Sequence, residues 1–73
     1  MTKYSKRDRE MAARLCSMFA CGYIWQAEFA LGIDRWSPAS ELAHSAIDVA
    51  WSSLHFGDAA AEAEAMIRTG WTP

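Results

Sequence analysis

Alanine is the residue type that most constrains the fold of this chain. It supplies 14 of the 38 apolar residues in a sequence of 73 residues. Alanine has the highest helix propensity and lets two helices approach closely, but each buried methyl removes little surface from water. Residues branched at Cβ are few, with one Val, four Ile and three Thr, which disfavours strands. The sequence therefore predicts an all-α fold with a small, closely packed core.

The first helix is predicted to begin after Ser5. The Ser5 hydroxyl can accept a hydrogen bond from the backbone N–H of Asp8, as in a capping box. Apolar residues then recur at steps of three and four, which is the period of one helix face. This series comprises Met11, Leu15, Met18, Gly22, Trp25 and Phe29. Because it runs through Gly22, we expect one long helix over residues 6–31, and a break at Gly22 into two helices is the alternative.

The second helix is predicted over residues 38–56 from its start and stop signals. Gly32 can end the preceding helix in a left-handed conformation. A capping serine followed by proline, Ser37-Pro38, is typical of a helix start. Gly57 then predicts the end of this helix, and the segment between residues 32 and 38 is expected to be a short linker.

The third helix is predicted over residues 59–69, with Asp58 as its cap and Gly70 as its stop. Short connections place successive helices beside each other. The sequence therefore predicts a single helical domain over residues 1–73, folded as a small bundle of three helices, or of four helices if the first one breaks at Gly22.

The charges are divided unevenly along the chain. Residues 1–14 hold five basic and two acidic side chains, and residues 15–73 hold two basic and seven acidic ones, so the net charges are +3 and −5. An acidic body is not typical of a general nucleic-acid binder. The basic start still gives the alternative function, a nucleic-acid-binding accessory protein that contacts phosphates. Its basic residues are Lys3, Lys6, Arg7, Arg9 and Arg14.

A helix-turn-helix interpretation of residues 26–42 fits poorly. That motif favours a small residue four positions before the turn glycine, and Glu28 holds this position before Gly32. The following helix starts without a basic residue and carries Glu41 where phosphates would lie. DNA binding through this segment is therefore the weaker hypothesis.

The cysteines and histidines form no recognisable catalytic or metal site. Cys16 and Cys21 lie in an apolar run, where a thiolate is disfavoured, so we expect two buried, reduced thiols. His44 and His55 lie about 16 Å apart along a helix axis, too far to share one metal ion. They belong to a polar stripe that we expect to be the solvated face of the second helix. We therefore expect no enzyme activity, no metal and no cofactor.

The chain is expected to be cytoplasmic, with no membrane partner. Its longest charge-free run near the start covers residues 15–27, which is thirteen residues. A helix that crosses a bilayer needs about 20. A basic start followed by an apolar run is typical of a signal peptide, but Asp8, Glu10 and Arg14 interrupt that pattern.

The four tryptophans are the strongest indication of function. Trp25 and Trp51 fall on the predicted apolar faces, so we expect them in the core. Trp36 lies in the linker and Trp71 follows the last helix. Either of these can fold back over the core. If they do not, they form an exposed aromatic patch, which usually marks a surface that binds a partner.

We therefore expect a non-enzymatic protein-interaction module, an adaptor or inhibitor that docks on a larger protein. Helical proteins of this size are common among the inhibitors that phages and mobile elements encode, such as anti-CRISPR proteins, an argument from size and class alone. A homo-oligomer is also expected, because so small a core is marginally stable by itself. The residues expected to bind the partner are Trp36, Trp71, Arg7, Arg9 and Arg14.

Overall fold

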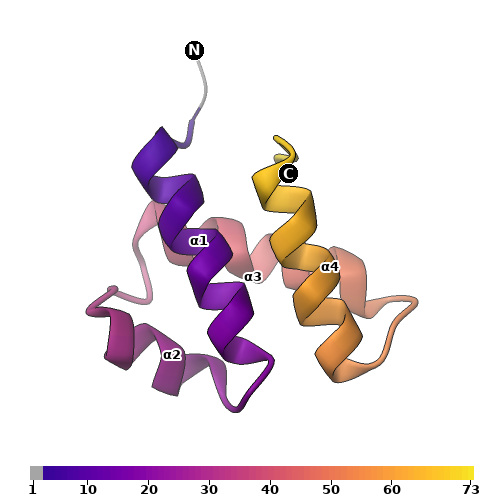
Figure 1. Ribbon diagram of the computed structural model, residues 1–73. Helices are drawn as coiled ribbons and strands as arrows, with labels where there is room; N and C mark the ends of the chain where they lie inside the picture. Colours follow the sequence, from indigo (N-terminus) through magenta and orange to yellow (C-terminus); the bar gives the residue numbers. More distant parts are fainter. Residues whose placement is uncertain (1–2) are drawn as a thin grey trace.

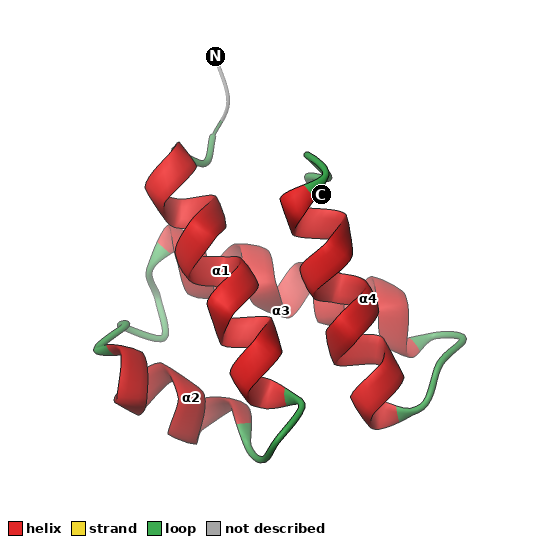
Figure 2. Cartoon of the chain, in the orientation of Figure 1, coloured by secondary structure: helices red, strands yellow, loops and turns green. Residues whose placement is uncertain are grey.

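The computed structural model describes residues 3–73, apart from the side chain of Phe56. Over this range the chain folds into four helices and no strand (Figure 2). The helices are α1 (Lys6–Phe19), α2 (Ile24–Leu31), α3 (Pro38–Trp51) and α4 (Phe56–Arg68). The predicted all-α fold is confirmed, in its four-helix form.

Three of the helices enclose the core, and the fourth lies at the edge of the molecule. α1 and α4 run side by side in opposite directions, and α3 crosses behind both of them (Figure 1). Each of these three helices contacts the other two. α2 contacts chiefly α1. The start of α1 and the end of α4 lie at the same end of the bundle (Figure 1).

The continuous helix expected over residues 6–31 is wrong, and the alternative with a break at Gly22 is confirmed. α1 ends at Phe19, and the backbone N–H groups of Cys21 and Gly22 donate to carbonyls three residues earlier. These tighter bonds close the last turn, as is common where a helix ends. Tyr23 then adopts an extended conformation before α2 begins. A glycine inside a helix costs about 0.5–1 kcal/mol, which favours a break at this position.

The break changes which side of the second segment is buried. If the helix were continuous, Trp25 and Phe29 would extend the apolar face of α1 into the core. In the structure they are 63% and 87% exposed, so the expectation that they pack in the core is wrong. The residues of α2 that face the core instead are Ile24, Ala27, Glu28 and Leu31.

The predicted starts of α1 and α3 are confirmed. The Ser5 hydroxyl accepts a hydrogen bond from the N–H of Asp8, and the Asp8 carboxylate accepts one from the N–H of Ser5, which completes a capping box. The Ser37 hydroxyl accepts from the N–H of Ser40 at the start of α3. Pro38 occupies the first turn, where its missing N–H has no consequence.

α3 ends earlier than the predicted range of 38–56. Its last residue is Trp51. The hydroxyl of the next residue, Ser52, donates a hydrogen bond to the carbonyl of Val49. Serine side chains that bond to the nearby backbone compete with the continuation of a helix. The seven residues that follow Trp51 also contain no long aliphatic side chain except Leu54, which is exposed.

α4 begins earlier than the predicted start at residue 59. Its first residue is Phe56, and His55 is the cap, although its side chain makes no capping hydrogen bond. Asp58 lies in the first turn instead of at the cap. An acidic side chain at this position still stabilises the helix, because it lies close to the positive end of the helix dipole.

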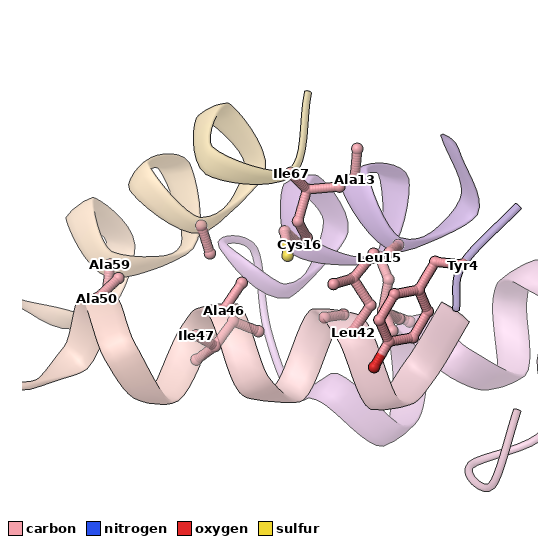
Figure 3. Packing of buried hydrophobic residues seen from close by; sticks show 14 residues of the cluster. Tyr4, Ala13, Leu15, Cys16, Leu42, Ala46, Ile47, Ala50, Ala59 and Ile67 are labelled. Atoms are coloured by element: carbon pink, nitrogen blue, oxygen red, sulfur yellow. The ribbon is translucent and has the colours of Figure 1, made fainter. Parts of the chain in front are cut away.

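The core is built mainly from alanine, as the composition predicts. Ten of the sixteen buried apolar residues described are alanines. The largest side chains with essentially no exposure are Tyr4, Leu15, Leu42 and Ile67. They lie in one cluster between α1, α3 and α4 (Figure 3). Most of the burial by long side chains in this cluster therefore depends on very few residues.

Gly32 gives the first testable prediction. It ends α2 with a φ of 66°, in the left-handed region. A Cβ at this position would meet no atom within 4 Å, so Gly32→Ala adds backbone strain alone. We expect it to lower the free energy of unfolding, measured in urea, by about 1 kcal/mol.

Gly57 provides a matched control for this substitution. It lies in α4 without a positive φ, and a Cβ there also meets no atom within 4 Å. Gly57→Ala is therefore expected to leave stability unchanged or to raise it slightly, since alanine is the better helix former. Equal destabilisation by both substitutions would contradict the role of the left-handed conformation at Gly32.

Candidate protein-interaction surface

Four aromatic side chains on α2 and in the loops beside it are more than half exposed. They are Tyr23, Trp25, Phe29 and Trp36. A fully buried aromatic side chain removes about 150–250 Å² from water, so together these four present on the order of 600 Å² of surface. Summed over two separate places on the surface, this exposure is comparable to the largest apolar patch on a typical monomer, about 300–600 Å². Apolar exposure on this scale is typical of a surface that binds another macromolecule.

Three of these residues form what we call the α2 aromatic face, which comprises Tyr23, Trp25 and Phe29. The rings of Tyr23 and Trp25 are stacked, with centroids 6.2 Å apart and planes 17° from parallel. Trp25 and Phe29 are four residues apart and therefore lie on the same side of the helix. The face carries no charge.

A recess of about 240 Å³ lies beside this face. Its lining is apolar or uncharged and comprises Met18, Cys21, Gly22, Tyr23, Gln26, Ala27 and Ala30. Cys21 is exposed with a free thiol, so the expectation that both cysteines are buried is wrong for Cys21 and confirmed for Cys16. Even on a continuous helix, Cys21 would lie about 140° around the axis from the buried Cys16 and so away from the buried side.

Trp36 stands at a second recess, of about 410 Å³, which we call the Trp36 recess. It is lined by Arg35, Trp36, Glu41, His44, Ser45 and Asp48. Trp36 is 83% exposed, although its backbone is held in place because its N–H donates to the Asp34 carboxylate at 2.8 Å. The guanidinium of Arg35 lies 5.4 Å from the ring centroid, which is within range for a cation–π contact.

Glu41, at one side of the Trp36 recess, is held by the N-terminal segment. Its Oε1 atom accepts hydrogen bonds from Lys3 Nζ at 2.6 Å and from Tyr4 Oη at 2.8 Å. The Lys3 hydrogen bond, followed by the one from Tyr4, lowers the pKa of Glu41, and the same contact raises the pKa of Lys3. The Tyr4 ring is buried, and this burial raises the pKa of its hydroxyl. Lys3 therefore already has an acidic partner within the chain.

A buried carboxylate attaches α2 to α3. Glu28 is 6% exposed and accepts a hydrogen bond from the Ser40 hydroxyl. His44 Nε2 lies 3.3 Å from the same Glu28 oxygen. In a catalytic triad the histidine lies between the serine and the carboxylate, whereas here the carboxylate lies between the other two. Ser40 has no exposed surface, so its hydroxyl is out of reach of a substrate, and its bond to Glu28 links α2 to α3.

Sequence reasoning missed Glu28 as an anchoring residue. In the sequence, Glu28 served only as evidence against a helix-turn-helix motif. The available signal was its spacing: it lies four residues after Ile24 and three before Leu31, on the side of α2 that packs against the core. An acidic residue on an apolar helix face predicts a buried partner for its carboxylate.

The Arg9 guanidinium makes its hydrogen bonds within the chain. Its Nη2 atom donates to the carbonyl oxygens of Ile67 at 2.5 Å and Trp71 at 2.8 Å, and so links α1 to the end of α4. Arg7 and Arg14 are exposed, and the described residues show no ion pair for either. Arg7 and Arg14 are seven residues apart on α1 and therefore lie on the same side of the helix, whereas Arg9 is engaged with the end of α4.

Trp71 folds back over the core, which was one of the two outcomes left open for it. It is partly buried and packs against the core cluster. Its N–H donates to the Met66 carbonyl at 2.9 Å. Trp36, in contrast, does not fold back over the core and is exposed. Trp51, the last residue of α3, is 48% exposed, so the expectation that it lies in the core is wrong. The expected binding residues Trp36 and Trp71 thus lie at different places in the fold.

The chemistry of the buried thiol does not favour nucleophilic catalysis. Burial, with a smaller contribution from the charge of Glu64, raises the pKa of Cys16 to about 12. A thiol with so high a pKa remains protonated at neutral pH, and the protonated form is a poor nucleophile. Cys16 therefore acts as a small apolar residue of the core.

Among the described residues, no group of three or more His, Cys, Asp or Glu side chains is placed to hold a metal ion. Within the same part of the chain, none of the helices has the length and apolar character needed to cross a bilayer. Comparisons with protein-family models, with curated proteins and with solved structures find no match to this chain.

Proposed function

We propose that this chain is a non-enzymatic protein-interaction module that docks on a larger protein through Trp36 and the Trp36 recess. The observation that carries the proposal is a tryptophan exposed on a backbone that is held by Asp34, with Arg35 against its ring. Tryptophan and arginine are enriched among the residues that dominate binding energy. A backbone already held in place also loses less conformational entropy on binding.

The charges around the recess favour a partner that presents a basic side chain. Asp48 is exposed at the edge of the recess, and the described residues give it no ion pair. A lysine or arginine of the partner would pair with the Asp48 carboxylate at the edge of the recess, beside the Trp36 ring that Arg35 already contacts. Residues 15–73 have a net charge of −5, which would attract a basic surface over a longer range.

Such a module acts as an adaptor or an inhibitor of the protein that it binds. We place it in the cytoplasm, where the free thiols of Cys16 and Cys21 stay reduced. The alternative function, phosphate binding by the basic N-terminal segment, has less support than the sequence suggested. Lys3 pairs with Glu41, and Arg9 bonds to backbone carbonyls, so fewer cations are available to nucleic acid.

Trp36→Ala tests the proposal. A residue that dominates an interface contributes about 2 kcal/mol or more, so the affinity for the captured partner should fall about 30-fold or more. The melting temperature should stay nearly unchanged, because the ring is exposed. The measurement is a pull-down from host lysate, with nuclease added, followed by titration of the recovered protein. Undiminished binding by Trp36→Ala would show that the recess is not the docking site.

Two charge reversals separate the recess from general electrostatics. Asp48→Lys places a positive charge at the recess, and Glu62→Lys makes the same change at an exposed position on α4. We expect only Asp48→Lys to weaken binding strongly. Equal loss with both variants would indicate attraction by net charge alone. Recovery that disappears on nuclease treatment and on Arg7→Glu substitution would favour the nucleic-acid alternative.

A further inference from the structure

We infer that the α2 aromatic face binds a second copy of this chain, so that two chains form a closed, two-fold symmetric dimer through α2. This inference is independent of the docking proposed for Trp36, since it uses different residues on a different part of the surface.

The absence of charge on this face favours a second copy as its occupant. Residues 15–33 contain one charged residue, Glu28, and it is buried. In a two-fold interface both copies use the same patch, so each charge on it needs an opposite charge elsewhere on that patch as its partner. An uncharged face needs no such pairing and leaves no charge buried without a partner. The Trp36 recess, by contrast, carries charges that suit a different partner.

The shape of the face is complementary to itself. At 100° per residue, Trp25 and Phe29 lie on one flank of the outward side of α2, and Gln26 and Ala30 lie on the other flank. The second flank belongs to the recess of about 240 Å³. A two-fold axis parallel to α2 therefore places the aromatic flank of each copy against the recess of the other. Phe29, 87% exposed, is the ring best able to enter that recess.

The exposed area is sufficient for such a dimer. The three aromatic residues and the recess beside them present on the order of 500 Å² per copy, since each fully exposed aromatic side chain accounts for about 150–250 Å². Two copies then bury on the order of 1,000 Å², which reaches the lower limit of specific protein interfaces. We therefore expect a dimer that dissociates in the micromolar range.

Sedimentation equilibrium of the full chain over a wide concentration range tests this inference. We expect the wild type to move from monomer to dimer. Phe29→Glu should remain monomeric, with at least a 100-fold weaker association, because two carboxylates would be forced into the apolar recesses. Ala30→Arg, which fills the recess from its other side, should have the same effect. Trp36→Glu, an equally exposed aromatic outside the face, should dimerise like the wild type.

Thiol labelling gives a second readout. Cys21 lies in the recess and is exposed, whereas Cys16 is buried. Maleimide labelling of Cys21 should slow as the protein concentration rises, and Phe29→Glu should abolish that dependence. A wild type that stays monomeric at several hundred micromolar would overturn the inference. It would also be overturned by open-ended assembly, or by a dimer lost through Trp36→Glu and retained in Phe29→Glu.

Discussion

Leu42→Ala is expected to lower the free energy of unfolding by about 3 kcal/mol, within the range of about 2–5 kcal/mol for buried leucines. Leu42 has no exposed surface and belongs to the single core cluster between α1, α3 and α4. Eight of the other thirteen members of that cluster are alanines, which have no rotamers with which to fill the resulting cavity. The measured loss in the free energy of unfolding should therefore include the full cost of the cavity.

The size of this effect is large relative to the whole stability of the domain. Globular proteins have about 0.05–0.15 kcal/mol of stability per residue, which for this chain is on the order of 4–11 kcal/mol. Urea unfolding followed by circular dichroism measures the loss. Leu54→Ala is the matched control, because Leu54 is exposed and should change stability by less than about 0.5 kcal/mol. Similar losses in both variants would contradict the core described here.

Arg9→Met is expected to lower the free energy of unfolding by about 2–3 kcal/mol. Arg9 donates to two backbone carbonyls, those of Ile67 and Trp71, at the end of α4. Hydrogen bonds that involve a charged group contribute about 1.5–3 kcal/mol each, and water can replace part of this at a partly buried position. Methionine keeps most of the aliphatic stem, so the substitution removes chiefly the guanidinium.

Arg7→Met is the control for this substitution. Arg7 lies two residues earlier on α1 and is exposed, so its replacement should change stability by less than about 0.5 kcal/mol. The loss caused by Arg9→Met should also persist at high salt, because its acceptors are carbonyls and not carboxylates. If 1 M salt removed the difference between the two variants, surface charge and not the link to α4 would be responsible.

The features of the fold that the sequence predicts well are those that depend on neighbouring residues. Ser5, Ser37 and Gly32 act through hydrogen bonds and backbone conformations within one turn, and the structure has all three in their expected roles. The continuity of a helix is harder to predict. The apolar period continues through Gly22, so the sequence pattern alone does not reveal that α2 turns a different side to the core.

The residues of the candidate binding surface were likewise predicted only in part from local sequence patterns. Trp36 was identified from its position in a linker, and it is exposed. Trp25 and Phe29 were assigned to the core because their spacing continued that of α1, and the break after Phe19 reverses this assignment. The partly buried position of Trp71 depends on contacts with α1 that are distant in sequence. No local pattern encodes such contacts.

The contact between α1 and α4 has a consequence for the order of events during synthesis. Arg9 meets acceptors 58 and 62 residues later in the chain. The part of α1 that packs against α4 is therefore left uncovered until α4 has left the ribosome. Proteins with such distant contacts gain little stability from partial chains, because the loop must close first. A ribosome-bound chain lacking residues 56–71 therefore lacks both acceptors of Arg9 and the core residues that α4 contributes, among them Ala63 and Ile67.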